Sequence, residues 1–203
     1  REFDSHMEMN TWDVEDMVEG IKALPVQWVF DLKDEIDGVR YKARLVGGGH
    51  VQPGHTWNEK FAPAIKWVTL RLFIIISLHR QNDICGADLK VAYLQSFMDA
   101  DEIVHVQLPA GYRIPGKVGR LRRSLYGCKQ SGRNHYKVLR DFILSHGYQQ
   151  HPFDPCLYYD KNVGAMQTMI AVQVDDILFS GPDGKRMQLA VATRFKCTTS
   201  DGL

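Results

Sequence analysis

Apolar and polar positions follow two periods along this chain. Runs that are rich in β-branched and aromatic residues, or that alternate apolar with polar residues, predict strands. Longer runs with apolar residues three and four positions apart predict helices. Strands are therefore expected at residues 26–33, 39–46, 83–89, 102–108, 156–161, 166–174 and 177–181. Helices are expected at residues 67–80, 131–146 and 185–196.

The connections between these elements favour an α+β fold. Asp37-Gly38 between the first two strands is typical of a hairpin turn. Residues 47–55 (GGGHVQPGH) and 109–119, which are rich in glycine and proline, predict loops. Hairpins dominate the order of elements, which disfavours a regularly alternating parallel sheet.

The composition is that of an ordinary soluble globular protein. The chain has 203 residues, 44% of them hydrophobic and 24% charged, and its longest apolar run is far too short to span a membrane. The acidic, mixed N-terminal residues do not resemble a signal peptide. The four cysteines form no CxxC pair, which favours free thiols in a reducing compartment. We therefore expect a protein that is not secreted.

The net charge of +1 conceals a strong asymmetry. Residues 1–37 carry eleven acidic and three basic residues, whereas residues 113–140 carry nine lysines or arginines and no acid. Such a basic run is either a solvated face or a surface that follows nucleic-acid phosphates. Tyr112, Tyr126 and Tyr136 lie among the basic residues, where they suit either stacking on bases or packing in a core.

Asp175 and Asp176 stand between two strand-forming runs in the sequence AVQVDDILF. If residues 166–174 and 177–181 pair, the two aspartates form a two-residue hairpin turn, and both carboxylates can serve one site. Aspartate is also a common turn residue, so a purely structural role is equally compatible with this stretch. Two adjacent carboxylates repel each other, and an exposed turn, ion pairs or bound cations would each relieve that repulsion.

A third aspartate, Asp88, ends the apolar strand of the sequence ADLKVAYL, and Tyr93 follows five residues later. A carboxylate on one strand that faces two on a neighbouring hairpin forms a cluster that needs cations. Mg²⁺ prefers such oxygen ligands. Two metals held by shared carboxylates stabilise the attacking and leaving oxygens of an in-line phosphoryl displacement.

Several motifs then occur in a recognisable order: WVFDLKDEIDGVRYKARLV, FAPAIKWVTLR, ADLKVAYL, VQLPAGY, RSLYGCKQSGR and VDDIL. Together they resemble the reverse transcriptase domain of Ty1/copia-type retrotransposon polyproteins, over about residues 8–203. The resemblance implies an α+β fold with a polymerase palm, a ferredoxin-like antiparallel sheet with helices, plus fingers. It implies an acidic N-terminal segment at 1–25, fingers at 26–82 and a palm with part of the fingers at 83–203. Residues 102–130 lie at an uncertain boundary, and the family's thumb and RNase H regions are expected to be absent.

The same resemblance implies the site residues. Asp88, Asp175 and Asp176 match the metal-binding catalytic aspartates, with Mg²⁺ or Mn²⁺ as cofactor. Tyr93 matches the aromatic residue that lies under the deoxyribose and excludes a 2′-hydroxyl. The implied nucleotide contacts also include Lys42, Arg44, Gly127 and Gln130, and the implied nucleic-acid contacts are Arg122, Arg123, Lys129 and Arg133.

The implied partners are a template–primer nucleic acid, deoxynucleoside triphosphates and the rest of the polyprotein, with no membrane. The implied location is cytoplasmic, in a virus-like particle, or nuclear. The sequence also departs from the family: Gln173 replaces the tyrosine of Tyr-Val-Asp-Asp, Gly48 replaces a lysine, and Gly132 and His135 replace proline and tryptophan. These changes predict impaired activity.

Two functions follow as alternatives. The chain is either the core of an RNA-directed DNA polymerase or a non-catalytic, nucleic-acid-binding or structural remnant of a retroelement. The histidine pairs His50/His55 and His146/His151 lack the ligand sets of zinc sites. The GGG of residues 47–49 lacks the Lys-Ser/Thr of a phosphate loop, and no hydrolase signature is present.

Overall fold

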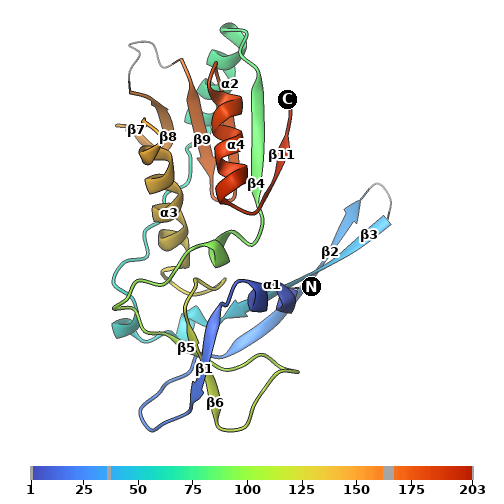
Figure 1. The fold of residues 1–203 in the computed structure, drawn as a ribbon, viewed down its shortest axis with the longest axis vertical. Coiled ribbons are helices and arrows are strands. Elements are labelled where there is room, and N and C mark those ends of the chain that lie inside the picture. Colours follow the sequence, from blue (N-terminus) through green and yellow to red (C-terminus); the bar gives the residue numbers. More distant parts are fainter. Residues whose placement is uncertain (1, 36–37, 162–166, 203) are drawn as a thin grey trace. The chain divides into compact units, whose positions relative to one another are not determined.

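Two separate clusters of buried apolar side chains organise the chain, one in each of two units. The computed structural model describes residues 2–35, 38–161 and 167–202 (Figure 1). Unit 1 comprises residues 1–61 and 93–135, and unit 2 comprises residues 62–92 and 136–203. Each unit is described by itself below.

Unit 2 is built on a six-stranded antiparallel sheet with the strand order β11-β4-β10-β9-β8-β7. Its strands are β4 (Ile84–Leu89), β7 (Tyr148–His151), β8 (Asp154–Asp160), β9 (Met169–Gln173), β10 (Asp176–Ser180) and β11 (Cys197–Ser200). The helices of this unit are α2 (Trp67–His79), α4 (Gly184–Arg194) and most of α3 (Ser131–Ser145).

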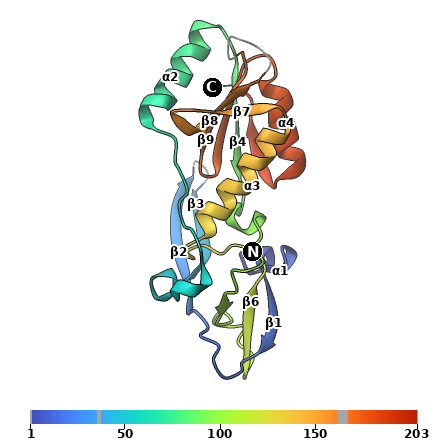
Figure 2. The same cartoon turned by 90° about the vertical axis from the view of Figure 1, so that its left-hand side faces the viewer.

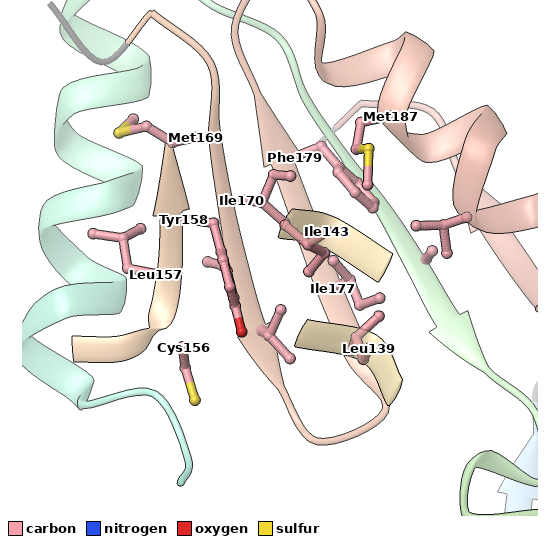
Figure 3. Close-up of a cluster of buried hydrophobic side chains, with 14 of the residues drawn as sticks. Leu139, Ile143, Cys156, Leu157, Tyr158, Met169, Ile170, Ile177, Phe179 and Met187 are labelled. Atoms are coloured by element: carbon pink, nitrogen blue, oxygen red, sulfur yellow. The ribbon is translucent and has the colours of Figure 1, made fainter. Parts of the chain in front are cut away.

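Helices cover both faces of this sheet, with α3 and α4 on one face and α2 on the other (Figure 2). Phe179 and Met187 are fully buried between the sheet and α4, whereas Leu157 and Met169 point toward α2 (Figure 3). Burial of each such side chain stabilises the fold by about 1.5–3 kcal/mol. The strongly amphipathic helix α3 contributes Leu139 and Ile143 to this core, as its apolar spacing predicts.

Unit 1 contains two small antiparallel sheets and its own core around Trp12, Leu45 and Leu125. One sheet has the order β1-β6-β5, and the other is the long hairpin β2-β3. Its elements are α1 (Glu2–Glu8), β1 (Trp12–Asp16), β2 (Val26–Glu35), β3 (Gly38–Gly47), β5 (His105–Val106) and β6 (Lys117–Leu121). Short 3₁₀ turns follow at η1 (Gly49–Val51), η2 (Gly54–Thr56) and η3 (Ala92–Gln95).

The predicted α+β class, with antiparallel pairing, is confirmed. The three predicted helices and the strands at 26–33, 39–46, 83–89, 156–161 and 177–181 are present with small shifts of their ends. Pairing of β2 with β3 confirms the first hairpin, although Asp37 of its turn lies outside the described residues. The strand predicted at 166–174 is β9, and residue 166 also lies outside the described part.

Two predictions about local structure were wrong. The loop predicted at 109–119 ends early because β6 begins at Lys117 and includes Gly119. A Cβ atom at Gly119 would lie 3.0 Å from Cγ of Trp12, so this glycine makes room for the indole ring rather than marking a loop. The strand predicted at 102–108 is only His105–Val106. The acidic N-terminal segment, for which no element was predicted, contains α1 and β1.

The two units divide the chain at different residues from the expected fingers at 26–82 and palm at 83–203. Residues 62–82 belong to unit 2, and residues 93–135 belong to unit 1. The names fingers and palm are therefore assigned below only as a proposal.

Candidate active site

A row of four polar side chains crosses unit 2 near one end of the sheet. Asp176 at the start of β10 is the register partner of Asp88 on β4 and of Gln173 on β9. Asp88 in turn is the register partner of Thr198 on β11. Residues directly opposite each other in antiparallel strands project from the same face of the sheet. We call Thr198, Asp88, Asp176 and Gln173 the polar row.

The turn between β9 and β10 is shifted by one residue from the prediction. Its two residues are Val174 and Asp175, and Asp176 is already part of β10. Val174 has φ +57°, which is unfavourable for a β-branched residue. The backbone N–H of Leu89 donates to the carbonyl oxygen of Asp175 at 2.8 Å, which ties the turn to the end of β4. The turn therefore keeps Asp175 beside the polar row.

We call Asp88, Asp175 and Asp176 the carboxylate cluster. The pKa of Asp176 is raised, first by partial burial and then by the negative charges of Asp175 and Asp88, while the positive charge of Lys90 acts to lower it. The Lys90 ammonium forms an ion pair with the carboxylate of Asp88. The cluster thus carries the mutual repulsion that a bound cation relieves.

The donor set of this cluster fits a hard divalent cation, because all three ligands are carboxylates. Within the described residues, however, no group of three His, Cys, Asp or Glu side chains is arranged to hold one ion. Lys90 is the positive charge that meets the cluster in this structure. Binding of a metal by all three aspartates therefore requires the carboxylates to turn toward one another, with Asp88 leaving Lys90.

A cavity of about 330 Å³ lies on the same face of the sheet. Its polar lining includes Asp88, Asp176, Gln173 and Thr198, and its apolar lining includes Ile65, Leu70, Ala171 and Leu178. All of these residues belong to unit 2. The polar row thus borders a cavity open to a ligand, beside Leu70 of α2.

Lys42 and Arg44 project from one face of the hairpin β2–β3. Asp31 is the register partner of Lys42, and its carboxylate lies 4.0 Å from the guanidinium of Arg44. The opposite face of this hairpin carries the exposed side chains of Phe30 and Tyr41, because neighbouring residues in a strand alternate in direction. The two predicted cations therefore share one polar face.

Tyr93 lies in η3, where its ring contacts two other rings of unit 1. Its ring centroid is 4.7 Å from that of Tyr126 and 5.8 Å from that of His135. The predicted nucleotide contact Gly127 has φ +85°, and a Cβ atom there would lie 2.3 Å from the carbonyl oxygen of Gly47. Gly127 thus permits a close backbone approach, but to the chain's own loop.

Two of the predicted contact residues have their side chains engaged in structural interactions. Gln130 is fully buried, where its amide accepts from Gln52 at 2.8 Å and donates to the carbonyl oxygen of Thr56 at 3.1 Å. The Arg133 side chain is 19% exposed and pairs with Asp99 at 2.6 Å, with Glu102 and Glu59 slightly farther away. Both side chains hold unit 1 together, which leaves them poorly placed for a ligand.

The remaining predicted nucleic-acid contacts also have partners within unit 1. Arg122 pairs with Asp13 at 3.2 Å. Arg123 stacks over the ring of Phe97 and donates to the carbonyl oxygen of Leu94. Lys129 lies 5.1 Å from the ring centroid of Trp57. The basic run of residues 113–140 is therefore partly neutralised by the chain itself.

Two members of the site, Lys90 and Thr198, were missed by the sequence reasoning. Lys90 directly follows β4, two residues after Asp88. Residues two apart in an extended chain project to the same side, so this ion pair could have been predicted once the end of the strand was known. Thr198 could not be found, because it joins the polar row only through pairing of the edge strand β11 with β4. No helix of the described residues has the length and apolar character needed to cross a membrane.

Comparison with known proteins agrees with this picture. The model of the family described as reverse transcriptase (RNA-dependent DNA polymerase) matches residues 9–199. The chain is 32% identical over 188 residues to the retrovirus-related Pol polyprotein from transposon TNT 1-94 of Nicotiana tabacum, covering 90% of this chain and 14% of that protein. It is 34% identical over 189 residues to the Pol polyprotein from transposon RE2 of Arabidopsis thaliana, covering 90% and 13%. It is 27% identical over 186 residues to the truncated transposon Ty1-A Gag-Pol polyprotein of Saccharomyces cerevisiae, covering 89% and 15%.

Proposed function

The chain belongs to the reverse transcriptase family of copia-type retroelement polyproteins, and on that premise we propose that it carries out two-metal nucleotidyl transfer as the core of an RNA-directed DNA polymerase. It spans about one seventh of the length of the relatives compared above, each covered to 13–15%. In this proposal the six-stranded sheet of unit 2 is the palm, and the hairpin β2–β3 of unit 1 belongs to the fingers.

The observation that carries the proposal is the register of Asp88 with Asp176 on adjacent strands, next to Asp175 in the turn. Directly opposed carboxylates destabilise a sheet unless positive charge, here from Lys90 or from a bound cation, offsets their repulsion. A pair of Mg²⁺ or Mn²⁺ ions, when bound, supplies charge stabilisation for an in-line phosphoryl displacement. Asp88, Asp175 and Asp176 would hold these ions, and the ion pair between Asp88 and Lys90 would break when the ions bind.

Other residues take roles that fit their surroundings. Lys42 and Arg44, on the polar face of the β2–β3 hairpin, contact the triphosphate through charge-assisted hydrogen bonds. The ring of Tyr93 rejects a ribonucleotide sterically by filling the space of its 2′-hydroxyl. Gln173, in the polar row, borders the cavity where the family has a tyrosine.

Nucleic-acid contacts are assigned to Arg122, Arg123 and Lys129, which retain solvent-accessible side chains. The proposed contact of Gly127 with the nucleotide is through its backbone alone. Gln130 and Arg133 are left out of the proposed contacts, because their polar groups bind other parts of unit 1.

The test is a calorimetric titration, in which a deoxynucleoside triphosphate together with Mg²⁺ is added to the full chain. We expect saturable, metal-dependent binding that Asp88→Asn and Asp175→Asn each weaken by roughly 100-fold, since each removes a charge that the metals need. Asp183→Asn is the matched control, because Asp183 also lies in unit 2 but pairs with Arg186 on the surface.

Equal binding in the wild type and in both cluster variants would refute the proposal, and so would an absence of binding in all of them. The chain would then be a non-catalytic remnant. Salt-sensitive binding of a single-stranded oligonucleotide, unaffected by Asp88→Asn and Asp175→Asn, would identify that remnant as a nucleic-acid-binding protein.

A further inference from the structure

The ring of Tyr93 is held on two sides by aromatic side chains that come from distant parts of the chain. Tyr126 contacts it in a tilted arrangement with an interplanar angle of 59°, and His135 contacts it edge-on at 75°. We call Tyr93, Tyr126 and His135 the aromatic cluster. All three residues belong to unit 1.

Tyr126 has little freedom to move, because its backbone is fixed on both sides. Its carbonyl oxygen accepts from the N–H of Gly47 at 2.7 Å. The preceding residue, Leu125, is fully buried. The following residue, Gly127, approaches Gly49 so closely that a Cβ atom on Gly49 would lie 1.9 Å from the carbonyl oxygen of Gly127. The tyrosine ring therefore extends from a rigid backbone.

His135 is fixed by the helix that carries it. It lies in the first turns of α3 and is only 3% exposed. Its neighbour Asn134 is also buried and donates to the hydroxyl of Ser124. The backbone of Tyr93 is held too, since its carbonyl oxygen accepts from the N–H of Ser96 at 3.0 Å and from its hydroxyl at 2.8 Å. The Tyr93 ring thus contacts two aromatic side chains whose backbones are themselves held in place.

We infer that Tyr126 and His135 are positioning residues for sugar selection: they hold the Tyr93 ring in the orientation that rejects a 2′-hydroxyl. This inference rests on the proposed function, in which Tyr93 lies under the sugar. A steric barrier is only as strict as the ring that forms it is rigid, because a ring that can tilt makes room for one oxygen atom. Aromatic neighbours limit such tilting through their preferred edge and offset geometries.

The experiment compares deoxynucleotide and ribonucleotide affinity in the full chain. A fluorescent deoxynucleoside triphosphate is bound with Mg²⁺ and displaced by unlabelled dCTP or CTP, which gives the ratio of the two dissociation constants. We expect Tyr126→Ala to reduce the preference for dCTP about fivefold, as befits one aromatic pair. Tyr126→Phe, which keeps the ring, should retain the wild-type ratio.

The control is Tyr112→Ala, which removes a different aromatic pair of unit 1, the stacked rings of Phe3 and Tyr112. It tests whether general loosening of the unit is enough to change the ratio. His135→Phe keeps a ring at the buried position and should preserve selection, whereas His135→Ala should weaken it. A reduction by Tyr126→Ala no greater than that by Tyr112→Ala would overturn the inference, as would an equal reduction by Tyr126→Phe.

A second measurement keeps the inference separate from the proposed function. The chain is labelled with 3-fluorotyrosine, and the ¹⁹F signal of Tyr93 is identified by its loss in Tyr93→Phe. We expect Tyr126→Ala to move this signal toward its position in the unfolded chain, and Tyr112→Ala to leave it in place. An unmoved signal in Tyr126→Ala would overturn the inference even if nucleotides bind. A wild type that binds no nucleotide would refute the proposed function, and the ¹⁹F result would still decide whether the ring is held.

Discussion

Strands β1 and β6 of unit 1 bring acidic residues beside basic ones, whereas β4 and β10 of unit 2 bring Asp88 opposite Asp176. In unit 1, Asp16 pairs with Lys117 at 2.7 Å and Asp13 pairs with Arg122 at 3.2 Å. Glu15 lies 3.7 Å from Arg120 and 3.3 Å from His105. We call these contacts of β1 the charge ladder.

The charges of the charge ladder are paired with opposite charges and so stabilise the fold, whereas the like charges of the carboxylate cluster repel one another. The charge ladder joins the acidic run near the N-terminus to the basic run of residues 113–140, so the two halves of the charge asymmetry partly cancel. The carboxylate cluster has three acids against Lys90, and the pKa of Asp176 is raised, first by partial burial and then by the charges of Asp175 and Asp88. An arrangement that costs stability and lines a cavity points to ligand binding. Four predictions test this contrast, and the largest expected effect comes first.

Arg133→Met should lower the free energy of unfolding by roughly 3 kcal/mol, because it leaves the buried carboxylate of Glu102 without its positive partner. Urea unfolding of the full chain measures the effect. Arg122→Met is the control from the same basic run, since its side chain is 53% exposed. Equal losses in the two variants would contradict a structural role that is special to Arg133.

Asp154→Ala should destabilise unit 2 by about 2 kcal/mol, because the backbone N–H groups of Lys66 and Cys156 lose their acceptor. Burial acts to raise the pKa of Asp154, but hydrogen bonds from Thr69, Lys66 and Cys156 together lower it. The stabilisation is therefore present above the ordinary carboxyl pKa of about 3.9 and is lost as pH falls through the lowered value. Thermal unfolding should show the difference between the two proteins shrink as pH falls below about 3.9, and a constant difference would contradict this origin.

Asp176→Asn should stabilise the metal-free protein at neutral pH, because it removes one of three neighbouring negative charges. The gain should be less than about 1 kcal/mol, since an exposed charge is largely screened. Its pKa is raised in the folded state, so the penalty is absent below about pH 3.9 and develops as pH rises through the raised value. Adding Mg²⁺ should raise the melting temperature of the wild type but not that of the variant.

The control for this prediction is Asp183→Asn, for which the expected change in stability has the opposite sign. The pKa of Asp183 is lowered by its hydrogen bond from Arg186, so Asp183→Asn should slightly destabilise the protein at neutral pH. If Asp176→Asn also destabilised the metal-free protein, the carboxylate cluster would be a structural feature like the charge ladder.

The double variant Asp13→Asn/Asp16→Asn should change stability little, by a few tenths of a kcal/mol, because both ion pairs are exposed to solvent. It frees Arg122 and Lys117, so binding of a single-stranded DNA oligonucleotide should strengthen at low salt. The slope of log affinity against log salt should steepen by about 0.7 for each freed cation that reaches a phosphate. Fluorescence anisotropy gives this slope, and an unchanged slope would mean that the basic face does not meet nucleic acid even when its acids are removed.

Local sequence predicted the interior elements of the fold well. Helices α2, α3 and α4 and strands β4, β8, β9 and β10 were found because their apolar spacing directly reflects burial. Strands β7 and β11 were not predicted, since both are edge strands of the sheet with largely polar sequences. The position of β11 depends on Gln188 of α4, whose amide donates to the carbonyl oxygens of Gly86 and Ser200.

The sequence by itself determined the family and the antiparallel α+β class, and it singled out the three aspartates as candidates, because motif order, strand period and residue type are local properties of the chain. Only the tertiary structure decided which charges have partners. It brought Asp13 to Arg122, buried Gln130, paired Arg133 with an acid distant in the sequence, and aligned Thr198, Asp88, Asp176 and Gln173 across four strands. Strand order and register, which these contacts require, arise from cooperative burial of the whole sheet and are not encoded by any short stretch.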